Sequence, residues 1–201
     1  TEHAWLETAP DRAVGLAACL GLKEAAIKAL GGRPPGFAWP DLGRDALETP
    51  PPRWLAGVLR DLGANDVATA TMRGHPGAWG RADEVVVAVV STLDADATVA
   101  AARVEIGADV AHGLTPGELA YAGSSASRRA GRQAARSAVL RLPGLKNVEV
   151  ETLPGIHPPT STRPCRGGTH APRVVIDGRE SDVGVSISHC PSMAVAVAWR
   201  A

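Results

Sequence analysis

The chain has 201 residues, 45% of them hydrophobic, and its 21 basic and 21 acidic residues give a net charge of +0. This length suffices for one ordinary domain or for two small ones that share a core. The charge balance excludes a global field that would draw the chain to nucleic acid or to a membrane surface. No apolar run approaches the ~20 residues that a helix needs to span a bilayer. We therefore expect neither nucleic acid nor a membrane as a partner.

The cysteines and the first residues favour a cytoplasmic protein. Cys19, Cys165 and Cys190 are odd in number and far apart, which matches neither a disulfide framework nor a zinc pattern. A reducing cytoplasm is the simplest setting for them. The opening stretch TEHAWLETAPDR has no basic region and no apolar core of a signal peptide. Because it also lacks an initiator Met, we expect a processed chain or an excised piece. The Ala-, Gly- and Arg-rich composition is typical of bacteria with high-GC genomes.

The first half of the chain predicts two helices and a strand. PDRAVGLAACLGLKEAAIKALGG is rich in Ala and Leu and is closed by Gly31 and Gly32, which indicates a helix. After the breaker stretch RPPGFAWPDL, PPRWLAGVLRDLGA is typical of a short amphipathic helix with Pro at its start. DEVVVAVVS contains a β-branched run and predicts a buried strand.

The second half predicts a long helix followed by a small antiparallel sheet. TPGELAYAGSSASRRAGRQAARSAVLRLPG indicates a helix of similar shape to the first. NVEVETL, PRVVIDG, DVGVSIS and MAVAVAW are typical of short strands. Residues 155–172 are rich in Pro, Gly, Ser and Thr, which predicts a loop that is either mobile or functional.

The two halves align with each other, which indicates a duplication. The first helix matches AGRQAARSAVLRLPG without a gap when Glu24 is set on Ser137, an offset of 113 (137 − 24). Thr1 matches Thr115 at an offset of 114, and DEVVVAVVS matches PSMAVAVAW at an offset of 108 (191 − 83). We therefore predict an α+β fold of two pseudo-twofold-related lobes, each a long helix packed on a small antiparallel sheet. The lobes cover residues 1–95 and 103–201, and residues 96–102 link them.

Glu24 and Lys28 lie one turn apart on the first predicted helix. A Glu four residues before a Lys is a common helix-stabilising pair, worth about 0.2–0.5 kcal/mol. The same pair could hold a metal and a phosphate, because a hard divalent cation prefers carboxylate oxygens and an ammonium group meets phosphate as a point charge. This segment alone leaves both interpretations open.

Three stretches resemble signatures of the 4′-phosphopantetheinyl transferases. LKEAAIKALGG followed by FAWPDL resembles their KEA-x-x-K helix and W-x-D-[IL] strand entry. GVSISHCPSMAVAVA resembles a strand ending in S-[IL]-[ST]-H before a strand such as A-V-A-V. IGADVAHGLTPGELAY resembles a G-[IV]-D-[IVL] strand that supplies an aspartate, followed by an F-T-x-x-E helix start. The lobe size is similar to that of the holo-acyl-carrier-protein synthases, and the duplication to the surfactin-synthetase-activator type.

The resemblance implies a fold, an activity and a set of site residues. Members of the family transfer 4′-phosphopantetheine from coenzyme A (CoA) to a serine of an apo acyl or peptidyl carrier protein, with Mg²⁺, and release 3′,5′-ADP. The resemblance implies catalytic roles for Glu24, Lys28 and His189, and metal binding by Glu24 and Asp109. The CoA-binding residues that it implies are Lys23, Lys28, Gly31, Gly32, Arg33, Ser188 and His189. The chain could be a domain cut from a polyketide or fatty-acid synthase.

Other interpretations of these residues stay open. His189 could be an ordinary exposed or capped histidine at a strand end, and Asp109 a strand-edge aspartate rather than a metal ligand. We expect Trp39 to pack the lobe and Asp41 to cap or turn the chain. The alternative function is a catalytically impaired relative that acts as a carrier-protein-binding or structural module.

The duplication would give two related sites between the lobes, and the resemblance predicts that only one of them is active. In the family, the glutamate and aspartate come from one lobe and the histidine from the other, a rule that Glu24 and His189 satisfy. In the mirror-image site Ser137 replaces the glutamate, Arg141 replaces the lysine, and Arg81 lies at or near the histidine position. The aspartate that belongs with Glu24 would precede the first residue, so we expect this chain to bind CoA but to transfer slowly.

Overall fold

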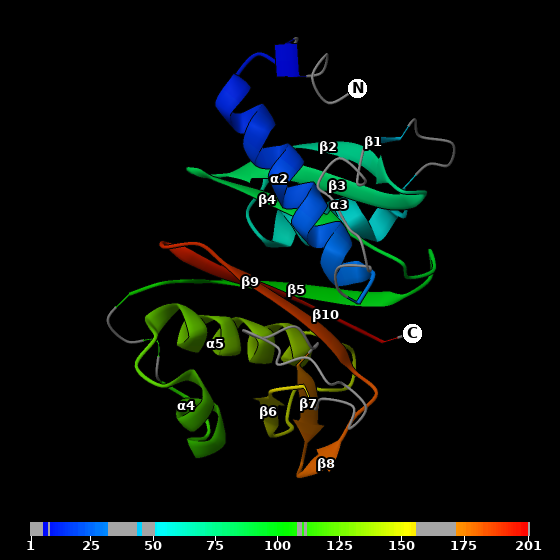
Figure 1. Ribbon diagram of the computed structural model, residues 1–201. Helices are drawn as coiled ribbons and strands as arrows, with labels where there is room; N and C mark the ends of the chain where they lie inside the picture. Colours follow the sequence, from blue (N-terminus) through cyan, green and yellow to red (C-terminus); the bar gives the residue numbers. More distant parts are fainter. Residues whose placement is uncertain are drawn as a thin grey trace, which may run out of the picture. The chain divides into compact units, whose positions relative to one another are not determined.

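A computed structural model describes residues 6–7, 9–31, 44–45, 51–107, 110, 112–155 and 172–200. The chain divides into two compact units, unit 1 (Thr1–Asp96) and unit 2 (Ala97–Ala201). The described residues form helices and small antiparallel sheets in both units, so the predicted α+β class is confirmed (Figure 1). Within the described part of the chain, no helix is long and apolar enough to cross a membrane.

Unit 1 is built around the predicted helix that carries Glu24, here α2 (Arg12–Ala29). The side chain of Asp11 caps its start by accepting hydrogen bonds from the backbone N–H groups of Ala13 and Val14, at 2.9 and 3.1 Å. These amides have no partner inside the helix, so the cap stabilises it. Past its end, Gly31 has a φ of 76°, a left-handed conformation that glycine adopts readily.

The sheet of unit 1 is antiparallel, and α2 packs across one of its faces (Figure 1). Its strand order is β1-β2-β3-β4, with β1 at Arg44–Asp45, β2 at Asn65–Met72, β3 at His75–Ala82 and β4 at Val85–Val90. A second predicted helix, α3 (Arg53–Asp61), is confirmed. Buried Leu22 and Ala26 of α2 pack with Met72 and Val90 of the sheet. The long helix and its sheet therefore share one apolar core.

Unit 2 packs its long helix, α5 (Ala126–Leu140), on a three-stranded antiparallel sheet of order β5-β10-β9. These strands are β5 (Thr98–Glu105), β9 (Gly184–His189) and β10 (Met193–Arg200). A second sheet contains β6 (Val150–Leu153), β7 (Arg173–Ile176) and β8 (Arg179–Glu180). Ala138 and Val139 of α5 are fully buried in the same cluster as Val185 and Ala196 of the first sheet.

Two segments of this half are organised differently from the sequence prediction. The single helix predicted over residues 115–144 is divided into α4 (Pro116–Ala122) and α5, because Gly123 takes a φ of 59° and ends the first helix. The predicted linker at 96–102 overlaps β5. Ala100 and Ala102 of that strand are buried in the core of unit 2, which makes this segment part of the sheet.

Each unit contains a β-hairpin, and the two hairpins pair their strands in the same register. His189 of β9 pairs with Ala194 of β10, and Arg81 of β3 pairs with Val86 of β4. Both partners are displaced by 108 positions (189 − 81 and 194 − 86), the offset found between the two strand sequences. Each hairpin packs against the long helix of its own unit. In the structure, the aligned strands therefore also have equivalent pairing.

Candidate functional site

Glu24 and Lys28 are exposed and lie one turn apart on α2. Although Lys28 is exposed as a residue, nearby protein atoms desolvate its amine and lower its pKa, while the charge of Glu24 acts to raise it. The two groups therefore lie close enough to interact, as an i,i+4 pair should. The neighbouring Lys23 is only 7% exposed, so its side chain is less accessible to a ligand.

Several predicted site residues lie outside the described part of the chain. These are Gly32 and Arg33, predicted to bind CoA, and Asp109, predicted to bind a metal. Trp39 and Asp41 of the strand-entry motif lie outside it as well. Gly31, which precedes Gly32 and was also predicted to bind CoA, is described and lies directly after the end of α2.

Ser188 and His189 form the end of β9 in unit 2. His189 is exposed and Ser188 is half-buried. The hairpin closes through the backbone N–H of Cys190, which donates to the carbonyl of Met193 at 2.8 Å. The imidazole thus stands next to a short turn that the backbone holds in place. Because Glu24 and His189 belong to different units, each is described only within its own unit.

Cys190, which follows His189, was not predicted to belong to the site. Partial burial acts to raise the pKa of its thiol, but hydrogen bonds from Ser192 and from backbone groups outweigh it and lower the pKa. The Cys190 sulfur lies 3.4 Å from the Ser192 hydroxyl oxygen. A lowered thiol pKa increases the thiolate fraction and hence the reactivity towards alkylating reagents. The sequence signal for it was only the C-P-S turn between two strands.

The mirror-image positions are engaged in other contacts. Arg141, which aligns with Lys28, donates a hydrogen bond from Nη1 to the backbone carbonyl of Ala101 in β5. Ser137, which aligns with Glu24, is half-buried and has no carboxylate to offer a cation. The helix of unit 2 therefore lacks the exposed acid-base pair that α2 presents.

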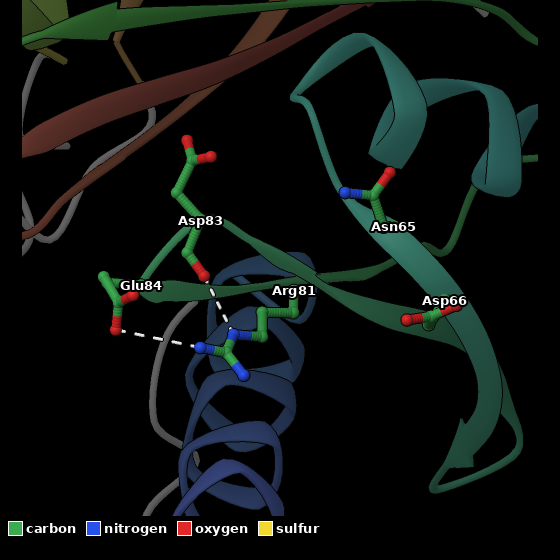
Figure 2. A pocket seen from close by; sticks show the side chains of 5 residues that line it. All are labelled: Asn65, Asp66, Arg81, Asp83 and Glu84. Atoms are coloured by element: carbon green, nitrogen blue, oxygen red, sulfur yellow. Dashed lines mark hydrogen bonds and ion pairs between the residues drawn. The ribbon is translucent and has the colours of Figure 1, made fainter.

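Arg81, the counterpart of His189, lines an open hollow of about 320 Å³ in unit 1 (Figure 2). Its Nε donates to the backbone carbonyl of Asp83 at 2.8 Å, and its Nη2 lies 3.7 Å from a carboxylate oxygen of Glu84. Asn65 and Asp66 line the same hollow. Three carboxylates against one guanidinium make this hollow a poor site for phosphate.

A buried polar cluster in unit 2 gives the T-x-x-E stretch a structural role. Glu118 is fully buried and forms a capping box with Thr115: each backbone N–H donates to the other side chain, at 3.0 and 3.2 Å. The second carboxylate oxygen of Glu118 accepts from the N–H and hydroxyl of Thr152, at 2.8 and 2.7 Å. The carboxylate therefore joins the start of α4 to strand β6.

Arg132 of α5 completes this cluster. It is 6% exposed, its Nη1 donates to the carbonyl of Thr152 at 2.9 Å, and its guanidinium lies 4.6 Å from the ring centre of Tyr121. Desolvation lowers the pKa of Arg132, partly opposed by Tyr121 and Glu118. The cluster stabilises the arrangement of α4, α5 and β6, and we assign it no part in catalysis.

Among the described residues, no three His, Cys, Asp or Glu side chains gather as a ready-made metal site. Mg²⁺, however, takes one or two carboxylates and keeps several waters, so the single exposed carboxylate of Glu24 on a regular helix fits that ion.

In the comparisons with known proteins, no family model and no curated protein matches this chain.

Proposed function

We propose that the protein transfers 4′-phosphopantetheine from CoA to a serine of an apo acyl or peptidyl carrier protein in the cytoplasm, releasing 3′,5′-ADP. The observation that carries the proposal is the exposed pair of Glu24 and Lys28 on α2 in one unit, with the Ser188-His189 strand end in the other. These are the positions at which the KEA-x-x-K and SISH signatures require accessible side chains.

The repeated helix-on-hairpin arrangement supports the fold part of the proposal. Each unit packs a long helix against an antiparallel hairpin in the same register. A transferase of the two-lobed type combines two such lobes and takes its site residues from both. We therefore include the 4′-phosphopantetheinyl transferase fold in the proposal.

Each site residue has a defined role in the proposed reaction. Lys28 binds phosphate oxygens of CoA as a point charge, and His189 binds a CoA phosphate from unit 2. Glu24 provides the anionic oxygen for Mg²⁺ and accepts the proton of the attacking serine hydroxyl. Mg²⁺ held by Glu24 would offset the negative charge that develops at the transferring phosphorus. The serine oxygen forms the new bond to phosphorus as the pyrophosphate bond breaks and 3′,5′-ADP leaves.

The test is a transfer assay with the chain, CoA, Mg²⁺ and an apo carrier protein, read by mass spectrometry of the carrier. We expect the carrier mass to increase by one phosphopantetheine, only when Mg²⁺ is present. A carrier whose acceptor serine is changed to Ala is the control and should stay unmodified. A carrier that binds the chain without being modified would favour the impaired module instead.

A further inference from the structure

The two related hairpins differ in what covers their second strand. In unit 2, β10 is the central strand, with β9 on one edge and β5 on the other. In unit 1 the counterpart of β10 is β4, which is the last strand of its sheet. Among the described residues, only β3 pairs with β4. The outer edge of β4 therefore corresponds to the edge of β10 that β5 covers.

The sequence of β4 is that of a covered strand. Its six residues are VVVAVV, and Val87 and Val90 are buried while the others are half-buried. Strands that remain at a sheet edge usually carry a charge, a proline or a bulge that prevents pairing with another chain. β4 has a regular register and none of these features. Its outer backbone groups are thus suited to a further strand.

The position of β5 in the chain indicates where that strand comes from. β5 precedes α4 and α5 in unit 2, and it pairs antiparallel with β10 from Met193↔Glu105 to Arg200↔Thr98. Thr1 aligns with Thr115 at the N-cap of α4. Residues 6–7 are helical, as are the aligned residues 120–121 in α4. The counterpart of β5 in unit 1 would therefore precede Thr1.

We propose that the outer edge of β4 binds one antiparallel strand, supplied by polypeptide that directly precedes Thr1, in the place that β5 occupies on β10. Arg141, at the end of α5, donates a hydrogen bond to the Ala101 carbonyl of β5. This contact shows that a strand in this place reaches the end of the long helix, which in α2 carries Lys28. The strand pairing and the internal alignment support this proposal whether or not the protein is a transferase.

Hydrogen exchange read by mass spectrometry tests the proposal on the full chain and on an extended chain. The extension is a second copy of residues 97–114, placed ahead of Thr1, so that β5 is followed by its own connection to the helix. We expect the amides of β4 to exchange faster than those of β10 in the parent. In the extended chain, exchange of β4 should slow by about tenfold or more, and the chain should stay monomeric in ultracentrifugation.

A matched control separates pairing from a mere effect of added length. The same extension with proline at the copied positions of Ala100 and Ala102, whose counterparts in β5 direct their backbone N–H groups towards β10, cannot donate those backbone hydrogen bonds, and should leave β4 exchange as in the parent. Three results would overturn the proposal. They are β4 amides as protected as those of β10 in the monomeric parent, a parent dimer that protects β4, and equal protection of β4 by the proline and native extensions.

Discussion

Arg141 donates a hydrogen bond to the backbone carbonyl of Ala101, which connects the end of α5 to strand β5. The helix alignment places Arg141 at the position of Lys28 (141 − 28 = 113). One of the five donors of this guanidinium is thus used inside unit 2. The two aligned helices therefore differ in their acidic position: α2 carries the exposed carboxylate of Glu24, whereas α5 carries the half-buried hydroxyl of Ser137.

Glu24→Gln should abolish Mg²⁺-dependent transfer and leave the fold intact. The amide has the size of the carboxylate but lacks the anionic oxygen that a hard cation needs. An exposed helical position should change the free energy of unfolding by no more than about 0.5 kcal/mol. Carrier mass spectrometry and urea unfolding measure the two effects. Asp61→Asn, which removes an exposed carboxylate at the end of α3, is the control and should transfer normally. Normal turnover of Glu24→Gln would exclude Glu24 as the metal ligand.

CoA affinity should weaken as salt rises if the exposed side chains of Lys28 and His189 bind its anionic phosphates as proposed, because salt screens exposed charges. Equilibrium dialysis across a salt series measures the slope. Lys28→Ala should bind more weakly and show a shallower slope than the parent. Lys146→Ala, which removes an exposed lysine from a turn of unit 2, should keep the parent slope. An affinity that does not respond to salt would contradict phosphate recognition by these side chains.

Cys190 should react with iodoacetamide at lower pH than the same cysteine in the urea-unfolded chain. The hydrogen bonds that lower its pKa exist only in the folded state, so the reactive thiolate forms earlier as pH rises. Ser192→Ala should shift the rise to higher pH. Cys19, 5% exposed, should be protected. Peptide-resolved mass spectrometry distinguishes the sites. Bound CoA should slow labelling of Cys190, and unchanged labelling would place CoA away from the His189 strand end.

Glu118→Ala should destabilise unit 2 by about 2–4 kcal/mol, because it leaves buried donors of Thr115 and Thr152 without their acceptor. Urea unfolding measures the loss, and Glu118→Gln should lose less. The control is Glu180→Ala, which breaks a largely exposed ion pair of 3.2 Å with Arg173, expected to be worth less than about 1 kcal/mol. Equal losses for the two alanine variants would show that the cluster does not stabilise the unit.

The helices and strands with a clear apolar pattern were predictable, whereas β2 and β3 were not. β3 contains Gly77 and Gly80 instead of β-branched residues. At Gly80 a Cβ atom would lie 2.8 Å from the backbone oxygen of Asn65, so a close strand approach requires the glycine. The glycines that make β3 hard to predict from the sequence are thus the residues that its close packing requires.

Among the site residues, features set by neighbouring residues could be predicted, whereas contacts between residues far apart in the sequence could not. The exposure of Glu24 and Lys28 follows from helical spacing, and the Thr115–Glu118 capping box from the T-x-x-E pattern. The bond from Glu118 to Thr152 joins residues 34 positions apart, and no local pattern indicates it. The helix break at Gly123 depends on a positive φ that an Ala- and Ser-rich stretch does not reveal.

Calorimetric titration of CoA into the chain, its Lys28→Ala and His189→Ala variants and the double variant tests most directly whether the two units share one site. We expect a single CoA per chain and a weaker affinity for each single variant. We expect no second site in Ser137→Glu, because Arg81 remains paired with Glu84. Two CoA molecules per chain, or CoA binding by both single variants as tightly as by the parent, would contradict a single site shared by the two units.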